Sequence, residues 1–144
     1  WAEWVTGLCY GGVFAGLWFS AGLPLVATTV IAGSVAFGAL AGALLLSHQP
    51  PQIETDRAAG KQSFAVRHGA DVARLWARRL HILALAAVVV AMTRHQVPAL
   101  VTLSFTIFGL LSIMSIGCPG VNPKRIMIST SALFAIVLLI SLLI

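Results

Sequence analysis

Charged residues are scarce in this sequence. Asp, Glu, Lys and Arg together make up 9% of the 144 residues, whereas 59% of the residues are hydrophobic, and the mean hydropathy is +0.98. A soluble domain of this length needs far more polar surface, so the scarcity of charge argues against one. We therefore expect an all-α fold in the form of a polytopic transmembrane helical bundle.

Cysteine is also rare. The two cysteines, Cys9 and Cys118, match no metal-ligand spacing, and we assign them no role. The chain begins at Trp1 without an initiator Met, and no basic stretch precedes its first apolar run, which argues against a signal peptide. We expect residues 1–144 to form a single transmembrane domain that is a piece of a longer protein.

The apolar runs contain no Asp, Glu, Lys or Arg at all. Five such runs predict about five spans, at residues 4–20, 24–47, 80–93, 98–117 and 126–144. Ion-coupled pumps and transporters usually carry charged residues inside their spans, so the absence of charge here weakens a transporter interpretation. Glycines four residues apart, which let helices approach closely in lipid, occur at Gly7 and Gly11, Gly12 and Gly16, and Gly38 and Gly42. The alternative is that glycine is simply common in membrane spans.

The positive charges lie almost entirely on one side of the predicted bundle. With five spans, residues 51–79 and 118–125 share a side and hold eight of the nine Lys and Arg residues, and the other side holds only Arg94. This asymmetry predicts that the polar loop at residues 50–79 faces the cytoplasm from the cell membrane. The net charge of +5 then reflects orientation and contact with anionic membrane lipid, and we expect no nucleic-acid partner.

The polar loop holds the residues with chemical potential. Pro50 and Pro51 end the second run, and Pro51 is suited to begin a short helix that carries residues 52–61. Oxygen atoms of Gln52, Glu54 and Asp56 are the kind that Mg²⁺ accepts, with water and phosphate completing its shell. The bases that follow, Arg57, Lys61 and Arg67, are suited to phosphate oxygens.

Such a set suits a lipid diphosphate whose tail lies among the helices. His48, at the end of the second run, is the nearest histidine to bind the same substrate, whereas His68 and His81 are expected to be interfacial polar groups. Phe64 and Trp76 are expected to anchor the loop among lipid headgroups. The other interpretation is a solvated loop whose charges only set the topology.

Residues 52–69 resemble a known motif. The run Gln-Ile-Glu-Thr-Asp-Arg-Ala-Ala-Gly-Lys, followed by Gln-Ser-Phe-Ala-Val-Arg-His-Gly, is similar to the second aspartate-rich motif of the UbiA superfamily of intramembrane prenyltransferases. The likeness is strongest to the 1,4-dihydroxy-2-naphthoate polyprenyltransferase branch. The hydropathy of the whole chain also resembles the C-terminal five of that family's nine helices.

The resemblance implies Mg²⁺-dependent transfer of an isoprenyl group from a prenyl diphosphate to an aromatic, quinone-precursor-like acceptor. Carried over by position, it makes Glu54 and Asp56 metal ligands and Asp56 and Lys61 catalytic residues. It assigns diphosphate binding to Arg57, Lys61 and Arg67, and to these we add Gln52 and His48 from their places at the start of the motif and just before it. The metal and the bases would offset charge on the departing diphosphate inside a water-poor cavity.

The sequence departs from the family pattern in two ways. Gln52 stands where the family usually has its first Asp, and an uncharged amide should hold metal more weakly. The family's first aspartate-rich motif has no counterpart here, so we expect an N-terminal portion of the same protein to supply it and the 144 residues alone to be inactive. Two alternatives remain: a degenerate relative that binds lipid diphosphate or partners without chemistry, and a small transporter or membrane assembly subunit.

Overall fold

The protein is helical throughout its described part. The computed structural model describes residues 2–22, 24–25, 27–94, 96–116 and 125. Its four long helices are α1 (Ala2–Ser20), α2 (Thr28–His48), α5 (Ala70–Arg94) and α6 (Ala99–Ser115). Three short elements lie between α2 and α5, namely the 3₁₀ helix η1 (Pro50–Gln52), α3 (Ile53–Ala58) and α4 (Phe64–His68). The prediction of an all-α fold is confirmed for this part.

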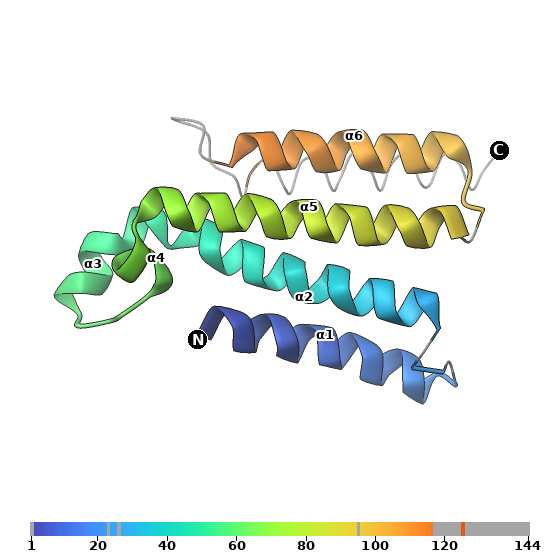
Figure 1. Ribbon diagram of the computed structural model, residues 1–144, viewed down its shortest axis with the longest axis horizontal. Helices are drawn as coiled ribbons and strands as arrows, with labels where there is room; N and C mark the ends of the chain where they lie inside the picture. Colours follow the sequence, from blue (N-terminus) through green and yellow to red (C-terminus); the bar gives the residue numbers. More distant parts are fainter. Residues whose placement is uncertain (1, 23, 26, 95, 117–124, 126–144) are drawn as a thin grey trace.

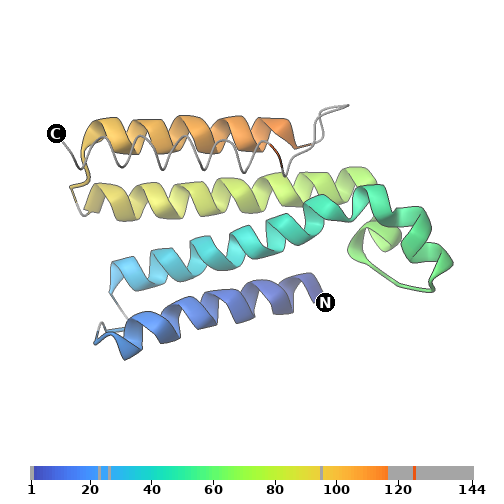
Figure 2. The same ribbon diagram turned by 180° about the vertical axis from the view of Figure 1, so that it is seen from behind.

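The long helices lie side by side in the order α1, α2, α5, α6, and α3 and α4 extend beyond one end of the bundle (Figure 1). The view from behind shows the same order, with the start of α1 at the end that carries α3 and α4 (Figure 2). Within the described residues, two helical stretches are long and apolar enough to cross a membrane, Thr28–Ala58 and Ala70–Arg94. Helix α6 is also apolar but shorter. The run predicted at 126–144 lies outside the described residues.

Helices α1 and α2 pack through glycine. A Cβ atom added at Gly38 would lie 2.5 Å from the carbonyl oxygen of Gly7, and one added at Gly11 would lie 2.8 Å from the carbonyl oxygen of Ser34. Backbone meets backbone here, so no side chain fits between the helices. The prediction of close glycine packing is confirmed at these positions. At Gly12 and Gly16 an added Cβ would meet no described atom within 4 Å.

Helix α5 packs on α2 through alanine. Ala36 and Ala39 of α2 form one buried cluster with Ala84, and Ala73 and Ala77 form a second buried cluster with larger apolar residues at the polar end. Small side chains on both helices let their backbones approach closely over this interface. Helix α5 is continuous, so the basic residues at 70–79 belong to the same helix as the apolar run predicted at 80–93.

The paired prolines do not break the chain sharply. Gln49 keeps right-handed helical backbone angles, and Pro50 and Pro51 occupy the first positions of η1, where a missing N–H costs little. The chain then enters α3 and leaves it at Gly60, which has φ +70°. Gly69, with φ +89°, separates α4 from α5. Residues 61–68 therefore lie between two glycines in backbone conformations that other residues rarely adopt.

Candidate functional site

The two acids of the motif lie on α3 and have different surroundings. Glu54 is 84% exposed and forms an ion pair of 3.1 Å with Arg57, three residues later on the same helix. Asp56 is only 13% exposed and lies 3.7 Å from Nζ of Lys61. Residues two apart on a helix point to different sides of it. The structure therefore brings Asp56 and Lys61 together but does not bring Glu54 to the same side.

The end of α3 explains how Lys61 returns to Asp56. The N–H of Lys61 donates to the carbonyl oxygen of Asp56 at 2.8 Å, and the N–H of Gly60 donates to that of Arg57 at 3.1 Å. This pair of bonds around a glycine with positive φ is a Schellman motif, a common helix ending. The Asp-Arg-Ala-Ala-Gly-Lys spacing thus folds a lysine back onto the aspartate one turn earlier.

The described side chains offer few ligands for a metal ion. Among the described residues, no group of three or more His, Cys, Asp or Glu side chains gathers in one place. Mg²⁺ in proteins commonly takes only one or two carboxylates and completes its shell with water and substrate phosphate. Asp56 fits that pattern as a single ligand beside Lys61. Further ligands would have to come from the substrate or from residues beyond those described.

The other predicted residues lie on α3 or on the elements just before and after it in the chain, and all are exposed. Gln52 ends η1, and His48 ends α2. Arg57 is held by Glu54, whereas the side chain of Arg67 on α4 makes no hydrogen bond or ion pair within the described part of the chain. Because α3 and α4 contact each other, Arg67 belongs to the same polar end as the Asp56–Lys61 pair.

A buried polar cluster joins this end to the long helices, and it was not predicted from the sequence. Glu3 of α1 is 4% exposed and Gln49 is 6% exposed. Oε1 of Glu3 accepts hydrogen bonds from Nε2 of Gln49 at 2.9 Å and from the N–H of Phe64 at 3.2 Å. Oε1 of Gln49 accepts one from the N–H of Ala65 at 3.0 Å. We call this set of hydrogen bonds the α4 clasp.

The ionisation of Glu3 reflects the clasp. Glu3 precedes the apolar part of α1, at the polar end of the bundle. Burial raises the pKa of its carboxyl group, but the hydrogen bonds from Gln49 and from the backbone lower it. The hydrogen bonds prevail, and the pKa lies below the ordinary value of 4.5. Glu3 is therefore a carboxylate near neutral pH.

Two predictions about aromatic and histidine side chains need correction. Phe64 does not face lipid headgroups, because it is 9% exposed and packs in a buried cluster with Leu46, Ala73 and Ala77. His81 is buried rather than interfacial, and its Nδ1 donates to the carbonyl oxygen of Ala77 at 2.8 Å. Both side chains follow the inward face of the helices that carry them, which apolar counting alone does not identify.

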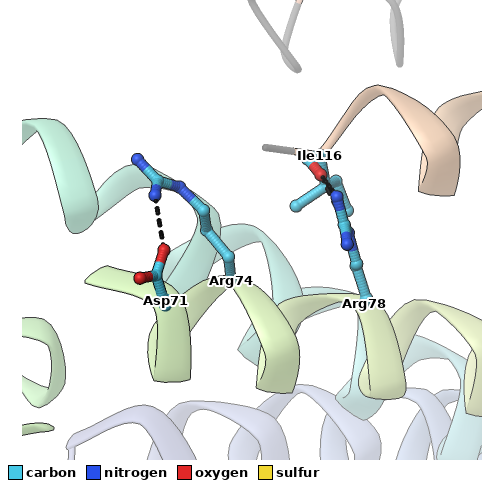
Figure 3. A network of polar contacts seen from close by, with 4 residues as sticks. All are labelled: Asp71, Arg74, Arg78 and Ile116. Carbon is cyan, nitrogen blue, oxygen red and sulfur yellow. Dashed lines mark hydrogen bonds and ion pairs between the residues drawn. The ribbon is translucent and has the colours of Figure 1, made fainter. Parts of the chain in front are cut away.

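The first turns of α5 add further basic side chains to the polar end of the bundle. Trp76 packs edge-on against Trp4 of α1, with ring centroids 5.6 Å apart, and the guanidinium of Arg79 lies 5.3 Å from the Trp76 ring. Arg74 pairs with Asp71, and Arg78 donates two hydrogen bonds to the carbonyl oxygen of Ile116 beyond the end of α6 (Figure 3). Arg78 thus satisfies a carbonyl at the C-terminus of a neighbouring helix.

An apolar groove begins at the clasp. It has a volume of about 640 Å³ and is lined mainly by glycines and small apolar residues of α1 and α2, with Leu80 and Leu83 of α5. Glu3 is the charged residue in its lining, so the residue that binds the start of α4 also marks the polar end of the groove.

In comparisons with known proteins, the chain matches no family model, no curated protein and no solved structure.

Proposed function

We propose that the chain is the C-terminal part of a UbiA-type prenyltransferase of the cell membrane. It would transfer an isoprenyl group from a prenyl diphosphate to an aromatic, quinone-precursor-like acceptor, with Mg²⁺ as cofactor. The observation that carries the proposal is the Asp56–Lys61 pair, held at 3.7 Å by the helix ending at Gly60. A carboxylate for the metal and a cation for phosphate are thereby placed next to each other.

The pair suits a ligand that carries both charges. Asp56 is shielded, but Lys61 is 70% exposed, so the ammonium group is free to exchange Asp56 for a phosphate oxygen. Asp56 would then face the metal, and Lys61 the departing diphosphate. Bound Mg²⁺ would supply the charge that stabilises the leaving group. Arg57, Arg67, Gln52 and His48 would add contacts to the diphosphate. Glu54 would act as a further metal ligand only after it leaves its pair with Arg57 and α3 rearranges, because the two acids point to different sides of the helix.

The apolar groove supports the second half of the substrate. A prenyl chain needs an apolar surface along most of its length, and the glycine- and leucine-lined groove is apolar apart from Glu3 and Ser34. Many large apolar side chains are also exposed on the described helices, such as Leu8 at 77%, Leu100 at 66% and Met114 at 69%. Such exposure is costly in water and favourable in lipid.

The topology is part of the proposal. Five spans with the polar end in the cytoplasm would put all the bases of residues 57–79 on the cytoplasmic side and Arg94, at the far end of α5, on the outer side. An N-terminal portion of the same protein would supply the first aspartate-rich motif. Membrane lipid surrounds the bundle in this arrangement.

The test compares two ion pairs in the protein as its gene encodes it. Asp56→Asn and Lys61→Ala should each lower prenyl transfer by about 100-fold or more, because each removes an interaction with charge that develops in the transition state. Asp71→Asn and Arg74→Ala break a matched pair on α5 that is 97% exposed at Asp71 and should leave turnover within about threefold of wild type. Near-normal turnover in both site variants would sink the assignment.

A catalytically degenerate relative is the second candidate. Gln52 stands in place of an acid, and α3 turns Glu54 away from Asp56, so a single carboxylate lies at the pair. Such a protein would bind lipid diphosphate and release it unchanged. Mg²⁺-dependent binding of an unreactive prenyl thiolodiphosphate, without any product from the natural diphosphate and acceptor, would favour this candidate over the enzyme.

A further inference from the structure

The start of α4 is capped from elsewhere in the fold. Ser63 occupies the N-cap position, but its hydroxyl makes no capping hydrogen bond. The first two N–H groups of the helix, those of Phe64 and Ala65, are bound instead by Glu3 and Gln49. Their partners are 61 and 16 residues away in the sequence. A helix of five residues has little stability of its own, so its position depends on this clasp.

The clasp is an expensive way to hold a loop. A buried carboxylate must recover its lost hydration through hydrogen bonds, and apolar residues of the same size often hold two segments together at least as well. Phe64 and Ala65 already supply an apolar contact beside it. What the polar groups add is direction, because hydrogen bonds fix the orientation of α4 where packing alone would tolerate sliding.

The segment that the clasp fixes carries two of the proposed diphosphate contacts. Lys61 precedes α4, and Arg67 lies on it. Gly60 and Gly69 bracket these residues with positive φ, so the backbone is able to turn at both ends if the clasp opens. Glu3 also lines the apolar groove, which ties the position of α4 to the place where the groove begins.

We propose that Glu3 and Gln49 are positioning residues for the diphosphate site, an inference that rests on the proposed function. They act through the backbone of Phe64 and Ala65 to keep Lys61 and Arg67 within reach of one diphosphate. Neither side chain has to touch the substrate. Without the clasp, residues 62–68 would be held against the long helices only by apolar contacts, and binding would have to reorder them.

The experiment uses a swap of the two side-chain types. Gln49→Glu puts a second carboxylate against Glu3 in a buried position and should open the clasp. Adding Glu3→Gln to that variant restores one amide and one carboxylate, which after a small rotation again accept both N–H groups and bond to each other. Gln62→Glu places a negative charge at an exposed position of the same segment and serves as the control.

Two quantities are measured on the full-length protein, as its gene encodes it, in lipid nanodiscs. The first is amide hydrogen exchange of peptides that cover Phe64 and Ala65. The second is the Kd for farnesyl S-thiolodiphosphate with Mg²⁺. We expect Gln49→Glu to speed the exchange and to raise the Kd about tenfold, the double variant to restore both within about threefold, and Gln62→Glu to change neither by more than that.

The outcomes separate the inference from the function on which it rests. Faster exchange in Gln49→Glu with an unchanged Kd would overturn the positioning role, and so would a Kd that the double variant fails to restore although exchange recovers. Unchanged exchange in Gln49→Glu would overturn the clasp itself. If the wild-type chain does not bind the probe, the proposed function fails and takes the positioning role with it.

Discussion

Helices α3 and α4 lie next to each other in one polar segment, but they are held in opposite ways. Every charge contact of α3 is local, since Glu54 pairs with Arg57 and Asp56 pairs with Lys61. Helix α4 is fixed by Glu3 and Gln49, which lie on or beside long helices. The first kind of contact depends on a few consecutive residues, and the second exists only once the chain has folded.

This difference separates the parts of the site that exchange partners from the parts that stay fixed. The Glu54–Arg57 pair is exposed and contributes about 0–1 kcal/mol, and the ammonium group of Lys61 is exposed although Asp56 is shielded, so both cations lose little when they turn to a ligand. Buried hydrogen bonds are costly to break, so α4 keeps its place during that exchange. A binding site for a charged headgroup needs both properties, a responsive charge and a fixed frame.

The sharpest test of this comparison removes one acid of each kind. Glu3→Ala leaves the N–H of Phe64 and the amide of Gln49 without their buried acceptor and should lower the free energy of unfolding by about 2–4 kcal/mol. Glu54→Ala breaks an exposed pair and should cost about 0.5 kcal/mol or less. Titration of each variant with SDS in mixed micelles measures the two values. Equal losses would contradict the distinction between local and tertiary contacts.

A second test applies the comparison to the long helices. Gly38→Ala drives a methyl group against the backbone of Gly7 and should destabilise the α1–α2 pair by about 1–3 kcal/mol. Gly12→Ala adds the same methyl group where no described atom lies within 4 Å, and better helix propensity should make it neutral or slightly stabilising. Thermal denaturation in detergent orders the variants. A Gly12→Ala protein that melts below Gly38→Ala would disprove the packing described for α1 and α2.

A third, smaller effect is expected on α5, where two arginines one turn apart differ in the same way. Arg78→Ala removes the donor that satisfies the carbonyl oxygen of Ile116, 38 residues away, and should cost about 1 kcal/mol. Arg74→Ala breaks only the pair with the exposed Asp71, three residues before it, and should cost about 0–0.5 kcal/mol. The same SDS titration serves as the measurement, and a larger loss for Arg74→Ala would count against the role of Arg78.

The comparison also marks what the sequence was able to predict. The apolar runs at 4–20 and 98–117 correspond to α1 and α6 within three residues at each end. A long apolar run predicts a membrane helix from composition alone, without reference to any distant residue. The Asp56–Lys61 pair also depends only on nearby residues, since both residues lie within one helix ending. The roles of all seven expected site residues remain predictions, and the structure gives only their positions at the polar end of the bundle.

Contacts between distant segments were not predictable in this way. Glu3 was the acid outside the polar loop, and its sequence neighbours gave no sign that it would meet Phe64. The helix that packs against Gly7 and Gly11 was equally unpredictable, because glycine spacing indicates a close approach without identifying the other helix. Phe64 was expected among lipid headgroups for the same reason: its exposure is decided by α4's orientation, which the clasp determines.

The smallest expected effect is the pH dependence of the clasp. The pKa of Glu3 is lower in the fold than its ordinary value of 4.5, so the folded protein binds fewer protons at this residue than the unfolded chain. The stability that Glu3 contributes is therefore complete above about pH 5.5 and is lost as the pH falls below 4.5 through the folded-state pKa.

The Glu3→Gln variant tests this dependence, because it keeps a hydrogen-bond acceptor but cannot titrate, and the other carboxyl groups titrate alike in both proteins. The difference in melting temperature between wild type and Glu3→Gln should thus be constant from pH 8 to about pH 5.5 and shrink toward pH 3. A difference that persists undiminished at pH 3 would mean that the carboxylate charge adds nothing to the clasp, and that the hydrogen bonds to α4 depend on geometry alone.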